Sequence, residues 1–114
     1  MTLHEIKDLL HCEVLSGGDT LELDVTQVVA SDGMSEILAS AKSRDLMITG
    51  LTNIQSIRTA DIAGVCAVIY CRGKLPEKKV IEFARQKRIP VLVTKMGMFD
   101  ICGVLYNKGL KGVS

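Results

Sequence analysis

"GVCAVIYCRGKLPEKKVIEFARQKRIPVLVT", residues 64–94, is the stretch of sequence that decides the fold. It opens with a short apolar run, continues as a polar segment, and closes with a second apolar run. When residues 76–87 are placed on a helix, the charges fall on one side and four apolar side chains on the other, namely Val80, Ile81, Phe83 and Ala84. Apolar strands joined by such a helix are typical of a parallel sheet covered on both faces.

The same alternation extends to both sides of this stretch. The apolar runs "DLMITG", "GVCAVIYC" and "IPVLVT" predict strands, and helices are expected at about 53–63, 76–87 and 97–108. Gly64 and Gly109 are suited to the ends of helices, and Pro76 to a first helical turn. We therefore expect an α/β fold, with three layers, a mainly parallel sheet and helices on both faces.

The first third of the chain is less regular. Thr2 and Glu5 have the spacing of a capping box at the start of an amphipathic helix. Residues 12–31 predict two extended segments around a turn at 17–19. After them, Ser31 or Asp32 could cap a helix that buries four side chains, namely Met34, Ile37, Leu38 and Ala41.

Length and charge exclude several classes of function. With 114 residues and a net charge of +1, the chain is expected to form one domain, residues 1–114. It has no basic run and only four aromatic residues, so we expect no nucleic-acid partner. The longest apolar run, 65–70, is far shorter than the roughly 20 residues that span a bilayer, and the N-terminal segment is amphipathic rather than a signal peptide. We expect a cytoplasmic protein without a membrane partner.

The cysteines and histidines predict neither a metal site nor a cofactor. No pair among Cys12, Cys66, Cys71 and Cys102 has CxxC spacing, so we interpret them as free thiols, with Cys66 and Cys102 buried as small apolar side chains. His4 and His11 share a helix face, but no third ligand lies near them in the sequence.

The loops that follow the three strands carry the best candidates for a binding site. Ligands bind beyond the carboxyl ends of parallel strands, where backbone N–H groups are free. These loops could hold a phosphate or carboxylate, although turn geometry and capping alone would also explain their composition. The candidate ligand-binding residues are Thr49, Gly50, Thr52, Asn53, Arg72, Gly73, Lys74, Thr94 and Lys95.

We find no catalytic constellation in the sequence. Cys71 lies beside Arg72, which could lower its pKa, but a cysteine nucleophile needs a base and nothing ties His4 or His11 to it. A non-enzyme is therefore expected, and a thiol-dependent enzyme or phosphotransfer protein that uses Cys71 is the alternative.

The helix at 97–108 predicts a homodimer, because its apolar residues extend around more than half of its circumference. Its core-facing arc centres on Met98, Cys102 and Leu105, which places Phe99, Val104 and Tyr106 at the margins as the interface. Arg58 and Asp61 could pair with each other or across such an interface, or simply reach solvent.

These features, in their order along the chain, resemble the DRTGG domain. The resemblance covers "TLHEIKDLLHCEVLSG", "SDGMSEILASAKSRDLMITG" and the segment from "IAGVCAVIYC" to "VLYNKG". That module accompanies CBS domains in regulated pyrophosphatases and precedes the catalytic domain of some phosphotransacetylases, and it is similar to the N-terminal domain of HPr kinase/phosphorylase. The resemblance implies that family's α/β fold.

Two loops differ from the pattern that gives the family its name. Leu51-Thr52 stands where an Asp-Arg pair would follow Thr49-Gly50, and Cys71-Arg72-Gly73 keeps only the final glycine of Thr-Gly-Gly. Stand-alone members are associated with gene clusters for iron hydrogenases and kinase-like proteins. This association suggests a regulatory or assembly partner. From the missing catalytic constellation, the polar strand ends and the apolar last helix, we expect a regulatory module that dimerises and binds a small anionic metabolite, a nucleotide or a protein partner.

Overall fold

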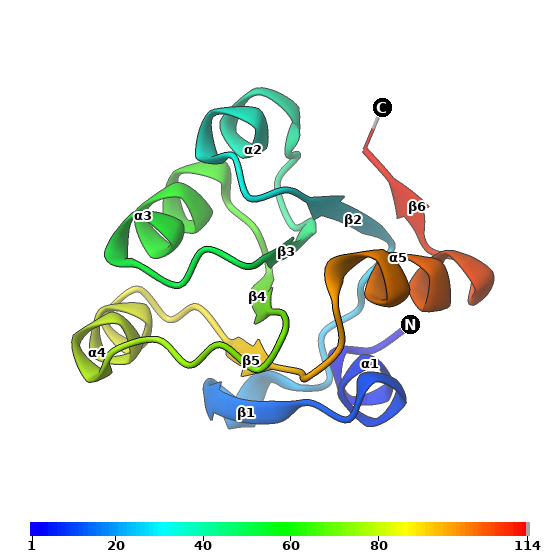
Figure 1. Cartoon of the computed structure of the whole chain (residues 1–114), viewed down its shortest axis with the longest axis horizontal. Coiled ribbons are helices and arrows are strands. Elements are labelled where there is room, and N and C mark those ends of the chain that lie inside the picture. The colour runs from blue at the N-terminus through cyan, green and yellow to red at the C-terminus, as the bar shows by residue number, and fades with distance from the viewer. Residues whose placement is uncertain (114) are drawn as a thin grey trace.

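The computed structural model describes residues 1–113, which form a six-stranded sheet in the order β1-β5-β4-β3-β2-β6 (Figure 1). The strands are β1 (Glu13–Ser16), β2 (Gln27–Ala30), β3 (Leu46–Thr49), β4 (Ala67–Tyr70), β5 (Val91–Val93) and β6 (Lys111–Gly112). The helices are α1 (Leu3–Leu10), α2 (Met34–Ser40), α3 (Ile54–Ala63), α4 (Lys78–Gln86) and α5 (Met98–Asn107), with a short 3₁₀ helix η1 (Gly18–Thr20). Only β1, which pairs with β5, is antiparallel.

The three central strands are buried on both faces, as their apolar sequences predict. In β3 and β4 every residue is buried, and Met47 pairs in register with Val68, which in turn faces Val91 of β5. Since successive side chains of a strand point to opposite faces, a strand without polar alternation requires a helix layer on each side.

Helices cover both faces of this sheet. On one face, α1 and α5 bury side chains that include Ile6 and Ile101 against Ile69. On the other face, α2, α3 and α4 pack against side chains such as Met47 and Val68. Figure 1 shows α2, α3 and α4 on the side of the sheet opposite α1 and α5. The expected three-layer α/β architecture with a mainly parallel sheet is confirmed.

Local capping signals fix several helix ends. Thr2 and Glu5 form the capping box: the Thr2 N–H donates to Glu5 Oε1 (2.9 Å) and the Glu5 N–H to Thr2 Oγ1 (3.1 Å). The bond from the Thr2 backbone N–H to the carboxylate, followed by the Thr2 side chain, lowers the pKa of Glu5. Gly64 ends α3 with a φ of 72°. The expectation for Pro76 is wrong, because α4 begins at Lys78 with Glu77 as its N-cap, so the proline precedes the helix.

The prediction for the start of α2 is also wrong in part. Gly33 is the N-cap and makes no side-chain capping bond. Ser31 Oγ instead accepts from the Gly33 N–H (2.9 Å), and Asp32 reaches the neighbouring β3 loop. Ile37 is buried as expected, but Leu38 is 46% exposed because it points away from the sheet.

The two extended segments of the first third are present, but they lie far apart. The turn at Gly17 and η1 separate β1 from β2, and the two strands then join the sheet beyond β5 and beyond β3. The last strand of residues 1–113 is β6, a short parallel strand beside β2 that the sequence did not predict. Within residues 1–113 we find no helix long and apolar enough to cross a bilayer.

Candidate functional site

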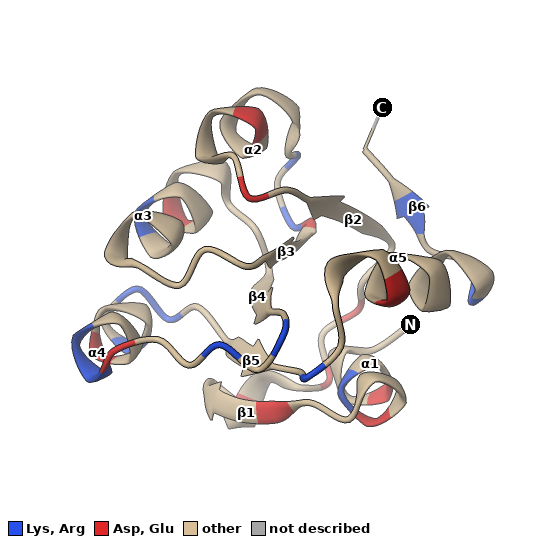
Figure 2. Ribbon diagram, viewed as in Figure 1, with Lys and Arg blue, Asp and Glu red and all other residues tan. Residues whose placement is uncertain are grey.

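The candidate site lies at the carboxyl edge of the parallel strands. Four loops meet there, after β2, β3, β4 and β5, as the sequence predicts for the last three. Figure 2 shows basic residues in the loops that follow β4 and β5, and an acidic residue where β2 leads into α2. This edge therefore combines charges of both signs.

Asp32, in the loop between β2 and α2, extends its carboxylate to the end of β3. Its Oδ1 accepts a hydrogen bond from the Gly50 N–H (2.7 Å) and one from Thr49 Oγ1 (3.4 Å). The Arg72 guanidinium lies near the other carboxylate oxygen, with Nη2 at 3.9 Å from Oδ2. The carboxylate of Asp32 thus fills the position that a bound anion would take in this loop.

Gly50 makes room for this arrangement. A β-carbon at position 50 would lie 2.6 Å from Arg72 Nη2 and 3.2 Å from Asp32 Oδ1. Any larger residue would therefore push the guanidinium away. The Thr-Gly at the end of β3 consequently has a packing role beside Arg72.

The loop after β4 is held in one conformation. Arg72 and Gly73 both have positive φ, 61° and 68°. The Arg72 N–H donates to Met96 O and the Gly73 N–H to Thr94 O, both at 2.8 Å. These two backbone bonds join the β4–α4 loop to the β5–α5 loop.

Several of the predicted polar residues are occupied by bonds within the fold. Thr94 Oγ1 donates to Leu10 O (2.7 Å) and accepts from the Met96 N–H (3.2 Å). Thr49 Oγ1 accepts from the Leu51 N–H (3.1 Å), and Asn53 caps α3 by accepting from the Ser56 N–H (3.2 Å). These side chains shape the loops, as turn geometry and capping would require.

A buried polar pair supports the start of α3. The Ser56 Oγ lies 2.6 Å from Tyr70 Oη and donates to Asn53 O at 2.6 Å. Tyr70 is fully buried, and this burial raises the pKa of its phenol, with the Ser56 bond acting in the opposite direction. The end of β4 is thereby joined to the N-terminus of α3.

A hollow opens beside this edge, between the end of α1, the start of β1 and the loops after β4 and β5. Its volume is about 500 Å³ and its lining residues are Leu10, His11, Glu13, Gly73, Leu75, Val93, Thr94, Lys95 and Met96. Most of its lining surface is apolar, and three of its lining residues are ionisable, namely His11, Glu13 and Lys95. This is the usual character of a small-molecule site, for which volumes of roughly 300–1,000 Å³ are typical.

The remaining candidates divide between the hollow and the solvent. Gly73, Thr94 and Lys95 line the hollow, as three of the nine predicted binding residues. Lys74 is exposed and Thr52 half-buried, and neither is a lining residue. Within the described part of the chain, Lys95 has no acidic group within 4.0 Å, whereas Arg72 has Asp32.

The cysteines are free, and their surroundings suppress ionisation of three of them. Burial raises the pKa of Cys12 and of Cys66 to about 11. Burial also raises the pKa of Cys102, to which the nearby Cys71 adds. Cys71 is fully buried in the core below α5, whereas Cys66 and Cys102 are only half-buried.

The candidate interface residues separate into two groups. On α5, Phe99 is 89% and Tyr106 66% exposed, while Val104 is half-buried against the core. The fully buried residues of α5 are Ile101 and Leu105, so Leu105 lies in the core as expected. Met98 and Cys102 are half-buried beside it, and the sequence did not place Ile101 at the centre of this arc.

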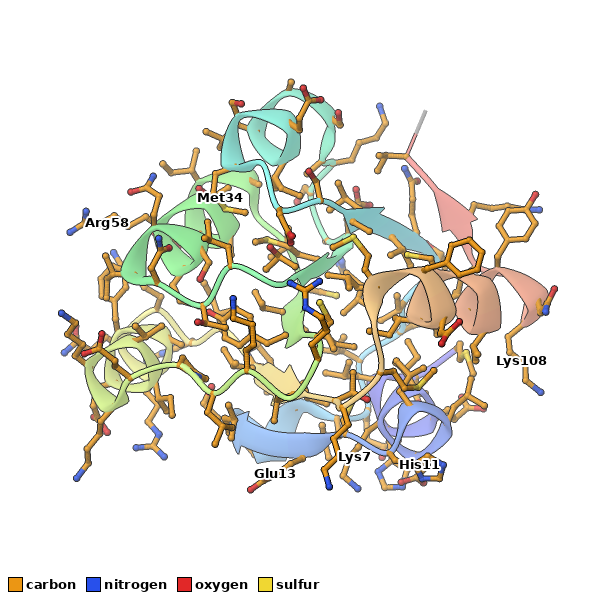
Figure 3. The ribbon with its side chains drawn as sticks, in the orientation of Figure 1. Lys7, His11, Glu13, Met34, Arg58 and Lys108 are labelled. Atoms are coloured by element: carbon orange, nitrogen blue, oxygen red, sulfur yellow. The ribbon has the colours of Figure 1, made fainter. Side chains whose placement is uncertain are left out.

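Arg58 and Asp61 lie on α3, which covers the opposite face of the sheet. Asp61 pairs with Lys87 of α4 (3.5 Å) rather than with Arg58. Arg58 points outward from α3, whose buried residues face away from it (Figure 3). A single flat interface therefore cannot contain both the α5 residues and the α3 residues.

Sequence reasoning missed Asp32, His11, Glu13 and Leu75 as parts of this edge. The "SD" before α2 was a signal for Asp32, but we interpreted it as a helix cap. His11 and Glu13 reach the hollow because β1 runs antiparallel to β5, which places the start of β1 beside the end of β5. No local pattern in residues 11–13 predicts that pairing.

Comparison with known proteins identifies the family. The model of the DRTGG domain matches residues 5–106. Among solved structures, the CBS and DRTGG domains of the regulatory region of Clostridium perfringens pyrophosphatase, complexed with the activator diadenosine tetraphosphate, are similar with a TM-score of 0.76 and 22% identity. The alignment covers 91% of this chain and 45% of that one. No curated protein matches the sequence significantly.

The family match extends over nearly the whole described sheet, and the structural likeness shows the same fold. The resemblance inferred from the order of the motifs is therefore confirmed, and the chain belongs to the DRTGG domain family.

Proposed function

We propose that this chain is a non-catalytic regulatory module that binds a small anionic metabolite, such as a nucleotide, in the hollow at the carboxyl edge. The observation that carries the proposal is the position of Lys95, an exposed cation without an ion-pair partner in residues 1–113, on the rim of a hollow with apolar walls. An ammonium group attracts a phosphate or carboxylate, and the apolar walls provide contact area for the rest of the ligand.

The fixed shape of the hollow favours binding. Part of its lining, Gly73 and Leu75, comes from the β4–α4 loop, which the bonds from Arg72 and Gly73 join to the β5–α5 loop. Because these bonds join two loops of the chain itself, a ligand would not have to order them, and little loop entropy would be lost on binding. Thr94 adds a further tie, to the end of α1.

The anion is proposed to bind near Lys95 rather than at the end of β3. Asp32 already accepts the Gly50 N–H there, and a second anion would meet its negative charge. The similar regulatory region from C. perfringens pyrophosphatase is complexed with a nucleotide activator, which supports nucleotides as the first ligands to test.

The thiol-dependent alternative is weaker. Cys71 is fully buried, so its sulfur has no access to a substrate unless the loop opens. A reactive cysteine is normally partly exposed in an electropositive environment. The second candidate function is regulation through a protein partner instead of a metabolite. An apolar side chain, that of Leu75, is exposed at the hollow and could contact such a partner.

A thermal-shift screen with nucleotides and acyl phosphates tests the proposal. A ligand present at 100 times its dissociation constant adds about 2.7 kcal/mol to the free energy of unfolding, which for a domain of this size raises Tm by several degrees. We expect at least one nucleotide to produce such a shift. The Lys95→Gln variant should lose it, whereas Lys108→Gln, which removes the same charge from the end of α5, should retain it. A flat screen would contradict metabolite binding and favour the protein partner.

We further propose a homodimer that pairs through α5. Phe99 and Tyr106 are large side chains that remain exposed on one helix, and burying them against a second copy would contribute about 1.5–3 kcal/mol each. A two-fold axis makes this patch face itself, so both copies contribute.

Sedimentation at tens of micromolar is expected to give a dimer for the wild type and a folded monomer for the double variant Phe99→Glu, Tyr106→Lys. Both side chains point to solvent, so the variant should keep its Tm apart from the loss of dimerisation. Ile62→Glu, on the exposed side of α3, serves as the control and should remain dimeric. A wild type that sediments as a monomer would rule out the α5 interface.

A further inference from the structure

We propose that the hollow binds a nucleoside monophosphate whose base carries an amino group, with the base edge at Glu13 and the phosphate at Lys95. This inference rests on the proposed function and names the ligand class for the same site. It follows from the chemistry of the lining, in which one anion and one cation come from different elements.

Glu13 and Lys95 lie at different levels of the hollow. Glu13, the first residue of β1, is in register with Val93, the last residue of β5. Lys95 follows two residues later, beyond the end of the sheet. Figure 3 shows Glu13 at the start of β1 and His11 at the end of α1, on the same lower side of the molecule. The anion of the hollow is thus beside the strands, and the cation beyond them.

The two charges impose an orientation on a ligand. The described ion pairs include neither Glu13 nor Lys95, although both line the hollow. A phosphate is repelled by the carboxylate of Glu13 and attracted by Lys95. An ionised carboxylate only accepts hydrogen bonds, so the opposite end of the ligand must present N–H donors, as the amino group of adenine, guanine or cytosine does.

The apolar residues that line the hollow suit a flat, apolar ring. Leu10, Val93 and Met96 are buried or half-buried, so their side chains are already packed in place. Leu75, also a lining residue, is 65% exposed and could cover one face of a base. Contact between the exposed leucine and such a ring would remove apolar surface from water and so stabilise the complex.

His11 adds a second planar contact. It ends α1 in the left-handed conformation with a φ of 54°, which a residue with a β-carbon rarely adopts. The helix terminates in this conformation, and His11 is one of the lining residues of the hollow. An imidazole ring can stack on a nucleobase.

Calorimetric titration of the full chain with adenosine monophosphate, purine riboside monophosphate and adenosine tests this assignment. Purine riboside monophosphate lacks only the amino group, so we expect it to bind about tenfold more weakly, the effect of one hydrogen bond to a charged acceptor. In Glu13→Gln this preference should shrink, because the acceptor loses its charge. In Lys95→Gln the affinity for the monophosphate should fall about tenfold, while that for adenosine stays unchanged.

The outcomes separate this inference from the proposed function. Lys108→Gln is the matched charge control, and circular dichroism should show native folding for every variant, since Glu13 and Lys95 are exposed. If the monophosphate binds equally well to wild type, Glu13→Gln and Lys95→Gln, the assignment is overturned while ligand binding by the chain stands. If inorganic phosphate alone competes as strongly as the nucleotide, the base contact is refuted. If no nucleotide or other anion binds, both proposals fail.

Discussion

Replacing Ile57 with alanine is expected to lower the free energy of unfolding by about 2–5 kcal/mol, because the change empties a fully buried position between α3 and the sheet. The lost methyl and methylene groups pack among residues such as Met47 and Val68 of the central strands. These strands are fixed on both edges by pairing, so the surroundings would collapse little into the cavity.

Ile62→Ala on the same helix is the matched control. The chemical change is identical, but Ile62 is 74% exposed, so its removal should alter stability by less than about 0.5 kcal/mol. Urea denaturation followed by circular dichroism measures both variants, with equal m-values expected if the native fold is kept. Equal losses at positions 57 and 62 would contradict the placement of α3 on the sheet.

The second large effect is expected at Gly17, where replacement by alanine should lower the free energy of unfolding by about 2–4 kcal/mol. This glycine has a φ of 76°, a left-handed conformation that costs an L residue roughly 1–2 kcal/mol. A β-carbon would also lie 2.7 Å from the Cα of Pro90 and 2.9 Å from its Cβ. Because part of this contact is backbone, relief requires the turn to move away from β5.

Gly18→Ala tests whether the loss of stability is specific to position 17 or occurs for any substitution in this turn. A β-carbon at Gly18 meets only Val14 Cγ1, at an ordinary 3.8 Å, and its φ is not in the left-handed region. We expect this variant to be within about 0.5 kcal/mol of the wild type or slightly more stable, because glycine loses more entropy than alanine on folding. A tolerated Gly17→Ala would show that β1 is free to move relative to β5.

The sequence predicted the elements well where one local property decides them. The apolar strands β3, β4 and β5 and the amphipathic α4 follow from periodicity, and the capping box at Thr2 follows from spacing. In α5 the same reasoning identified an excess of apolar surface, and Phe99 and Tyr106 are indeed exposed. Val104 is half-buried, as expected of a residue at the margin of the core-facing arc, and its place in an interface stays a prediction.

The candidate site could be predicted only in outline. Parallel strands bring their carboxyl ends to one edge, so Gly73, Thr94 and Lys95 were found from the strand pattern. The hydrogen-bond partners of these side chains could not be predicted. The Thr94 hydroxyl, for example, donates to the carbonyl of Leu10, which lies 84 residues away in the sequence. Whether a hydroxyl is available to a ligand depends on such distant partners.

By itself the sequence determined the α/β class, the parallel centre of the sheet and the family, because burial on two faces forces apolar strands to alternate with amphipathic helices. The tertiary structure alone decided where β1 and β2 join the sheet, and this set the composition of the site. Pairing with β5 brings His11 and Glu13 to the hollow, and pairing with β3 brings Asp32 to the Gly50 N–H. The physical reason is that strand pairing joins backbone groups of almost any sequence, so local residues specify a strand but not its neighbour.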